Sequence, residues 1–107
     1  DIKGLQLPVE KPWARSVYWM YGIVLAEETG LDADWLTQRL RERGIDTRPF
    51  FLGMHEQPAL RQRGLFRDER YPVAERIARQ GLYLPSGLAI TEEQLIQVCE
   101  AVHEVLS

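Results

Sequence analysis

Cysteine is almost absent from the sequence. Its 107 residues include a single one, Cys99, so the chain can form neither an internal disulfide nor a thiolate metal cluster. A lone thiol fits a reducing compartment, and we expect a cytoplasmic protein. The apolar neighbours of Cys99 predict that its side chain packs in the core.

Long apolar runs are also missing. No segment approaches the ~20 consecutive apolar residues that span a bilayer, and the opening DIKGLQLPVEKPW lacks the charged-then-apolar pattern of a signal peptide. We therefore expect no membrane partner. The first residue is Asp1 and not methionine, so we expect the chain to be a piece of a longer protein.

The chain has no excess of basic charge. Its net charge is −3, and eleven of its thirteen basic residues are arginines with Asp and Glu mixed among them. Surfaces that bind nucleic acids usually carry a basic excess and a recognisable module, and this sequence has neither. We expect no nucleic-acid partner.

Self-sufficient catalytic motifs are absent as well. The sequence has no glycine-rich phosphate loop, no His-x-x-x-His pair and no serine in a nucleophile elbow. The two histidines, His55 and His103, lie far apart, and no second ligand accompanies His103 at a helical spacing, which favours a solvated or partly buried helical histidine. The sequence predicts no catalytic residue and no metal site within this chain.

What is present is the alternation of strands and helices expected of one small domain. Residues 1–15 lack periodicity and suit an extended connector from a missing large domain, which leaves residues 16–107 as the folded domain. The run 17–26 predicts a central strand covered on both faces. A helix over 32–43, capped by Asp32 and ended by Gly44, precedes a short edge strand over 46–51.

The second half repeats this alternation. After an irregular loop over 55–64, Pro72 begins a helix that ends at Gly81, followed by a strand over 82–85. Thr91 and Gln94 predict a capping box for the last helix. The residues expected to face inward are Val73, Ile77 and Ala78 in the first of these helices and Leu95, Ile96, Cys99, Val102 and Leu106 in the second. The fold class is α/β (α+β), a small sheet of about three strands packed with helices.

Three segments resemble a known family. They are AxxVYWMYGIVL, GIDTRPFFLGMHEQPAL and YPVAERIARQGLYLPSGLAITEEQLIQVCEAV, in the order and at the spacing found in the C-terminal small domain of the DegT/StrS-type sugar aminotransferases, perosamine synthetase-like members among them. The resemblance covers about Ala14 to Leu106. It implies the small-domain fold of fold-type I aminotransferases.

The resemblance also implies an activity for the longer protein. Such enzymes are usually homodimers that depend on pyridoxal phosphate and move an amino group from glutamate to a nucleotide-linked keto sugar. The chemistry needs a lysine that forms a Schiff base with the cofactor. The lysines here are Lys3 and Lys11, both in the predicted connector, so we expect this chain alone to be inactive and not to bind pyridoxal phosphate tightly. The family's dehydratases, which replace that lysine with histidine, remain an alternative.

In the family, the segments that match TRPFF and MHEQP approach the sugar and cofactor. Arg48 then offers a planar fork for a carboxylate or phosphate, and His55 and Gln57 can bond sugar hydroxyls. Tyr18 is the aromatic residue expected to line the cleft. The alternatives are a surface ion pair for Arg48, a loop-fixing role for His55 and plain packing for the aromatic residues.

Two other interpretations stay open. The chain can be an independent small-molecule-binding regulatory α/β module, or an interaction domain built on its arginine-rich middle. Of Phe50 and Phe51, adjacent in a strand, one can point into the core. The turn LPSG over 84–87 is either a domain junction or an ordinary turn. A domain cut from its parent would also leave an apolar face uncovered and self-associate.

Overall fold

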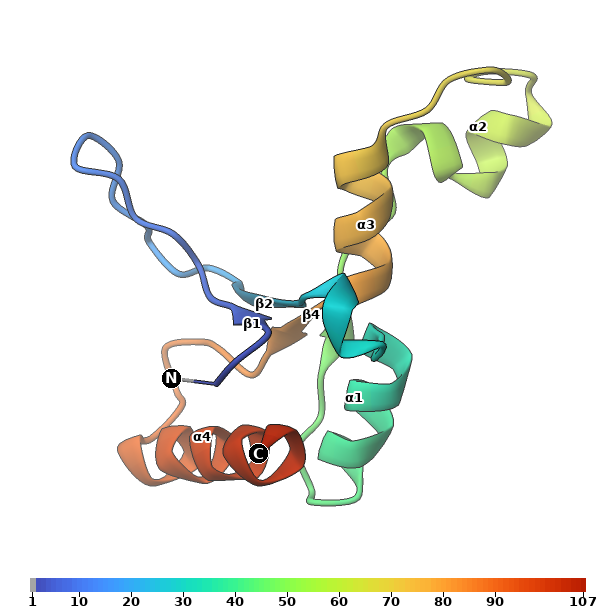
Figure 1. Cartoon of the computed structure of the whole chain (residues 1–107). Coiled ribbons are helices and arrows are strands. Elements are labelled where there is room, and N and C mark those ends of the chain that lie inside the picture. The colour runs from blue at the N-terminus through green and yellow to red at the C-terminus, as the bar shows by residue number, and fades with distance from the viewer. Residues whose placement is uncertain (1) are drawn as a thin grey trace.

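The computed structural model describes residues 2–107 and contains a four-stranded antiparallel sheet covered by helices (Figure 1). The strand order is β1-β2-β4-β3. The strands are β1 (Leu5–Gln6), β2 (Tyr21–Leu25), β3 (Arg48–Pro49) and β4 (Gly81–Leu84). The α-helices are α1 (Ala33–Arg41), α2 (Pro58–Gln62), α3 (Pro72–Gln80) and α4 (Glu92–Leu106), with short 3₁₀ turns η1 (Glu27–Thr29) and η2 (Met54–Glu56). The predicted fold class is confirmed.

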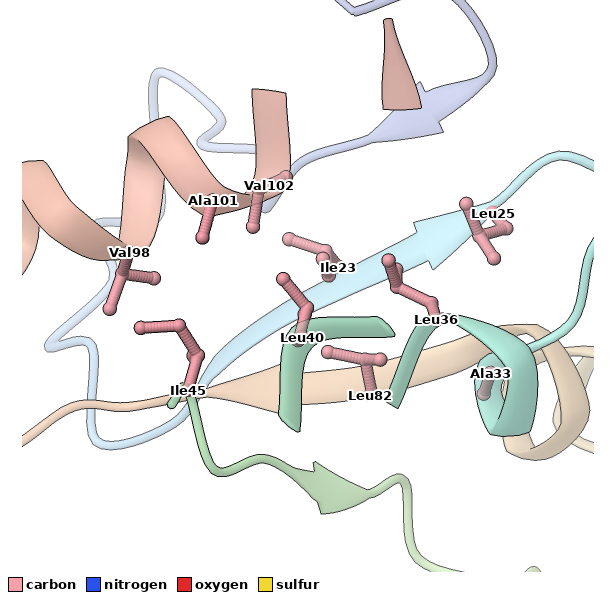
Figure 2. Close-up of a cluster of buried hydrophobic side chains, with 10 residues drawn as sticks. All are labelled: Ile23, Leu25, Ala33, Leu36, Leu40, Ile45, Leu82, Val98, Ala101 and Val102. Atoms are coloured by element: carbon pink, nitrogen blue, oxygen red, sulfur yellow. The ribbon is translucent and has the colours of Figure 1, made fainter. Parts of the chain in front are cut away.

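The core lies between one face of the sheet and helices α1 and α4. Ile23 of β2 pairs with Leu82 of β4, and both are almost fully buried. Figure 2 shows Leu36 and Leu40 of α1 beside Ile23 and Leu82, with the buried residues of α4 completing the same cluster. Each such leucine stabilises the fold by about 1.5–3 kcal/mol through the apolar surface it removes from water.

Helix α1 begins and ends where its sequence predicts. The Asp32 carboxylate accepts a hydrogen bond from the Trp35 N–H at 2.8 Å, which caps the first turn. Gly44 has a left-handed φ of 76°, and the Ile45 N–H donates to the Leu40 carbonyl at 3.0 Å. This closes the predicted Schellman ending and returns Ile45 to the core.

Helix α4 has the predicted capping box, but its buried face is rotated from the predicted one. Thr91 accepts from the Gln94 N–H, and the Gln94 side chain accepts from the Thr91 N–H. The buried residues are Val98, Ala101 and Val102, whereas Leu95, Ile96 and Cys99 are exposed. The prediction of a buried Cys99 was wrong. Apolar residues make up more than half of this helix, but α1 and the sheet pack against only one side of it.

The sheet differs from the predicted one in two places, the start of β2 and the presence of β1. Strand β2 starts at Tyr21, not at residue 17, because Tyr18 adopts a left-handed φ of 50° that an extended strand excludes. A fourth strand, β1, comes from the segment expected to be a connector and pairs with β2 through Leu5 and Leu25. Residues 7–20 then form an arm that projects from the body, as Figure 1 shows in blue.

The junction of α3 and β4 brings Gly81 close to its neighbours. Gly81 does not take a left-handed cap conformation but opens β4 with an extended φ of −111°. A Cβ at Gly81 would collide with the Phe50 ring and the Ile77 carbonyl, so this position requires glycine for close approach. Val73, expected to face inward, is exposed.

Two kinds of feature are absent from residues 2–107. In this part of the chain no helix is both long and apolar enough to cross a membrane. The same residues contain no group of three or more His, Cys, Asp or Glu side chains placed to hold a metal ion.

Candidate functional site

Arg48 lies in an open hollow of about 500 Å³ beside the sheet edge. Met20, Asp46, Phe51, Tyr83 and Ser86 are among the other residues that line it. A hydrogen bond attaches the segment that carries Arg48 to α1. The hydroxyl of the buried Thr47 donates to the Thr37 hydroxyl at 3.3 Å. Successive residues of an extended segment point to opposite sides, which leaves Asp46 and Arg48 exposed.

Within residues 2–107 no carboxylate pairs with Arg48. Its side chain is exposed. The surface ion pair considered for Arg48 is therefore absent from the described residues. A planar guanidinium in this state can bind a carboxylate or phosphate through two parallel hydrogen bonds.

An aromatic wall borders the same hollow. The Tyr83 ring lies 4.3 Å from the Phe50 ring and 5.5 Å from the Phe51 ring, measured between centroids. Phe50 is half-buried against Gly22 and Gly81, whereas Phe51 is 63% exposed and lines the hollow. Neither ring joins the buried core cluster, so the expectation that one of the two points into the core was wrong: Phe50 packs on Gly22, Gly81 and Tyr83, and Phe51 points outward.

Tyr18 lies at a second hollow, of about 410 Å³. Its ring stacks on Tyr21 with 5.9 Å between centroids, and nearly half of its surface is exposed. The two hollows share Leu84, Pro85 and Ser86. The turn that begins at Leu84 therefore separates Arg48 on one side from Tyr18 on the other.

His55 and Gln57 do not line either hollow. His55 is buried, with its Nε2 atom 3.1 Å from Glu75 Oε1 and its ring edge-on to Tyr71 at 4.9 Å. The Gln57 side chain donates to the Leu52 carbonyl at 3.2 Å. In this arrangement both side chains fix their own loop, and His55 ties that loop to α3.

Glu75 is the centre of this second cluster, and the sequence analysis missed it. Its carboxylate accepts hydrogen bonds from Arg70 Nη2 at 2.8 Å and from the Tyr71 N–H at 3.1 Å. The Arg70 guanidinium, joined by the Tyr71 N–H, lowers the pKa of Glu75 to about 2. The signal that could have revealed Glu75 is its place in the first turn of a helix that begins at Pro72.

A neighbouring ion pair strengthens the same attachment. The Arg79 guanidinium of α3 donates to the Glu56 carboxylate of η2, and these hydrogen bonds lower the pKa of Glu56. The loop 52–57 is therefore joined to α3 through both His55 and Glu56. Neither pair lies at the Arg48 hollow, so this cluster attaches the loop 52–57 to α3 and does not fill the hollow.

Comparison with known proteins agrees with the fold. Residues 1–103 match the model of the DegT/DnrJ/EryC1/StrS aminotransferase family. The GDP-perosamine synthase of Escherichia coli O157:H7 is 31% identical over 90 residues, which covers 84% of this chain and 23% of that protein. The GDP-perosamine synthase of Caulobacter vibrioides is 34% identical over 92 residues, covering 86% of this chain and 24% of that protein.

Solved structures agree as well. DesV of S. venezuelae, whose crystal structure is a complex with a ketimine intermediate, superposes with a TM-score of 0.83 at 30% sequence identity. The superposition covers 99% of this chain and 27% of DesV. The chain thus spans about a quarter of the length of each of these proteins.

Proposed function

The chain belongs to the DegT/DnrJ/EryC1/StrS aminotransferase family, and from this premise we propose that it is the small domain of a pyridoxal-phosphate-dependent sugar aminotransferase. The complete enzyme would transfer an amino group from glutamate to a nucleotide-linked keto sugar. The observation that carries this proposal is the family match over residues 1–103, which includes every residue of the Arg48 hollow. The similarity to two GDP-perosamine synthases supports the substrate class.

Within that enzyme this chain contributes one wall of the substrate cleft. Arg48 binds an anionic group of a substrate, which its exposure and its lack of an ion pair within residues 2–107 support. Tyr18 faces the cleft from the other side of the turn that begins at Leu84. His55 and Gln57 do not contact the substrate in this proposal. They hold the loop that follows Phe51 in place.

The residues of this chain do not fit pyridoxal phosphate as its attachment site. Lys3 and Lys11 are both exposed and precede β2, and neither lines the hollow that contains Arg48. We therefore propose that the cofactor and its lysine belong to a part of the longer protein outside this chain. When bound there, the cofactor would supply the electron sink that transamination requires.

The proposal extends to the partners and location of the complete enzyme. Glutamate serves as the amino donor, two copies of the enzyme form a homodimer, and the protein works in the cytoplasm. The single thiol of the chain is consistent with a reducing compartment.

The test is an assay of the full-length protein with glutamate and nucleotide-linked keto sugars, in which the amino sugar is detected by mass spectrometry. Arg48→Ala is expected to lower kcat/KM by about 10- to 100-fold, the usual loss for a charged hydrogen-bonding partner. Arg41→Ala removes another exposed arginine, from α1, and serves as the matched control. A dehydrated sugar in place of an amino sugar would reject the proposal in favour of the dehydratase branch.

A further inference from the structure

We propose that the arm over 7–20 docks on a second copy of the protein and places its Trp13 side chain in an apolar hollow beside α4 of that copy. The inference rests on the proposed homodimer and adds a surface through which two copies meet. Four features carry it: the rigidity of the arm, the exposure of its apolar side chains, the lining of the hollow and the charges on the two sides.

The tip of the arm is a tight turn that fixes the position of Trp13. Lys11 and Ala14 exchange two backbone hydrogen bonds, at 3.0 and 3.3 Å, around Pro12 and Trp13. The proline ring fixes φ at the first central position of this turn and so limits the conformations that the tip can adopt. A tryptophan held in this way loses little conformational freedom when it binds.

The rest of the arm is held away from the body of the chain. The Glu10 carboxylate accepts a hydrogen bond from the Ser16 N–H at 2.9 Å, and the Ser86 hydroxyl donates to the Trp19 carbonyl at 3.1 Å. Tyr18 keeps a left-handed φ of 50°, a conformation that costs free energy for a bulky residue. Figure 1 shows the tip of the arm well away from α4 of its own chain. The arm is therefore a fixed projection whose tip is directed toward another molecule.

The apolar side chains of the arm are exposed to water. Trp13 is 84% exposed, Val17 is 90% exposed and Val9 is 65% exposed, and no residue of the arm is buried. Tryptophan is enriched among the residues that carry the binding energy of protein interfaces, because its large rigid ring buries much surface at a low entropic cost. A tryptophan at the tip of a fixed projection is suited to enter a hollow on another molecule.

A third hollow, here called the α4 hollow, has the lining that an indole ring requires. Its volume is about 310 Å³, and residues of β1, β2 and α4 line it. Leu5, Ile23 and Val102 are among its apolar residues, and Cys99 and His103 of α4 border it as well. Because the described residues of its lining include no carboxylate, lysine or arginine, the α4 hollow suits an apolar side chain better than an ion.

The charges beside Trp13 and those beside the α4 hollow are opposite in sign. Lys11 and Arg15 are exposed on either side of Trp13, and within residues 2–107 neither forms an ion pair. Helix α4 carries four glutamates and neither lysine nor arginine. Glu100, which follows Cys99 in that helix, is exposed and likewise has no ion pair in this part of the chain. Docking of the arm at the hollow therefore brings opposite charges together, which favours association.

The partner is a second copy because each copy carries both an arm and a hollow. With a two-fold axis between the copies, the arm of each enters the hollow of the other, so the contact forms twice and the assembly closes as a dimer. Reciprocal docking also covers the exposed Trp13 of both copies at once.

The experiment is disulfide trapping in the full-length protein. A copy that carries Trp13→Cys and Cys99→Ser is co-expressed with an otherwise unaltered copy that has a different affinity tag. Under mild oxidation we expect a disulfide that joins position 13 of the first copy to Cys99 of the second, identified by mass spectrometry of the digested protein. Such a link can form only between copies, because the first copy lacks Cys99.

Val73→Cys in place of Trp13→Cys is the matched control, because Val73 is an exposed apolar residue of α3, outside the arm. The link from position 13 is expected to form at least about tenfold faster than the link from position 73, since docking raises the local concentration of the two thiols. Equal rates would overturn the inference. A link from position 13 to a cysteine other than Cys99 would also overturn it, because the tip would then contact another part of the longer protein.

Charge reversal tests the orientation of the docked arm. Lys11→Glu in the first copy is expected to slow the link about fivefold, because it places like charges beside each other, and Glu100→Lys in the second copy is expected to restore the rate. Arg41→Glu reverses the charge of an exposed arginine of α1 and should leave the rate unchanged. A rate that Lys11→Glu does not lower, or that Glu100→Lys does not restore, would overturn the docking of the arm beside Glu100.

The mass of the full-length protein in solution, measured by light scattering, separates failure of this inference from failure of the proposed homodimer. A dimer without a link above the control would overturn the inference and leave the homodimer standing through another surface. A protein that is monomeric at every concentration would reject both.

Discussion

Phe50 is held in place by two positions at which the chain has no side chain. A Cβ built on Gly22 would lie 2.6 Å from Phe50 Cζ, and one built on Gly81 would also collide with this ring. The glycines of β2 and β4 therefore let the ring approach the sheet closely enough to support Tyr83 at 4.3 Å. Through Tyr83 this contact fixes the wall of the Arg48 hollow.

Gly22→Ala is expected to destabilise the chain by about 1–3 kcal/mol, because the new methyl group forces Phe50 out of its position. The measurement is urea-induced unfolding. Phe50→Leu provides the matched background, since a shorter side chain leaves room for the methyl group. A Gly22→Ala cost that is the same with Phe50 and with Leu at this position would show that the contact does not constrain the site.

Glu75 predicts a pH dependence of stability. Its pKa is about 2 in the folded chain against 4.5 without these contacts, so the folded state favours the ionised carboxylate. The stabilisation is fully present above pH 4.5 and is lost as the pH falls from 4.5 toward 2. The free energy of unfolding should therefore fall over this range more steeply in the unaltered chain than in Glu75→Gln.

Urea unfolding between neutral pH and pH 3 measures this difference. Glu28→Gln removes an exposed carboxylate outside the cluster and should keep the steep pH dependence. If Glu75→Gln and the unaltered chain lose stability in parallel, the hydrogen bonds from Arg70 and Tyr71 do not stabilise the folded state.

At the scale of elements, helix caps, which depend on neighbouring residues, were predicted correctly. Strand pairing and helix packing, which depend on distant segments, were not. Asp32, Gly44 and Thr91 were placed correctly, because capping depends on groups within a few residues. Strand β1 was missed because two residues show no periodicity, and their pairing depends on β2, which lies far along the chain. The buried side of α4 was predicted incorrectly because the helix is apolar on two neighbouring sides, and only one of them packs against the rest of the chain.

The site divides in the same way. Arg48 was expected at the site through a resemblance, and its role as a substrate ligand stays a prediction; Phe51 was not singled out beforehand as a residue of the hollow. Glu75 was not found, because its importance depends on His55, twenty residues away in the chain. Contacts over such distances leave no periodic pattern in a single sequence.

Helix α4 gives the prediction that belongs to this scale. Thr91→Ala removes the side-chain acceptor for the Gln94 N–H, which is one half of the capping box, and should cost about 1 kcal/mol. Thr91→Ser keeps a hydroxyl at the same place and should cost less than half as much. Chemical unfolding of both variants measures the difference, and equal losses would exclude a capping role.

The whole molecule is more open than a compact domain of its length. Its radius of gyration is 15.5 Å, against about 13 Å for a compact chain of this size. The arm over 7–20 extends from the body and exposes Trp13 and Val17, and α4 exposes Leu95 and Ile96. Exposed apolar surfaces of this kind often mark contacts with other protein, and they are consistent with the proposal that further protein completes the Arg48 hollow.

The central claim is that this chain supplies a substrate-binding wall and that the amine that holds the cofactor lies outside it. The most direct test is to incubate the chain and the full-length protein with pyridoxal phosphate, reduce with borohydride and locate the labelled lysine by mass spectrometry. The account predicts a label in the full-length protein on a lysine outside residues 1–107, with Lys3 and Lys11 at background in both samples. A stoichiometric label on Lys3 or Lys11 would contradict it.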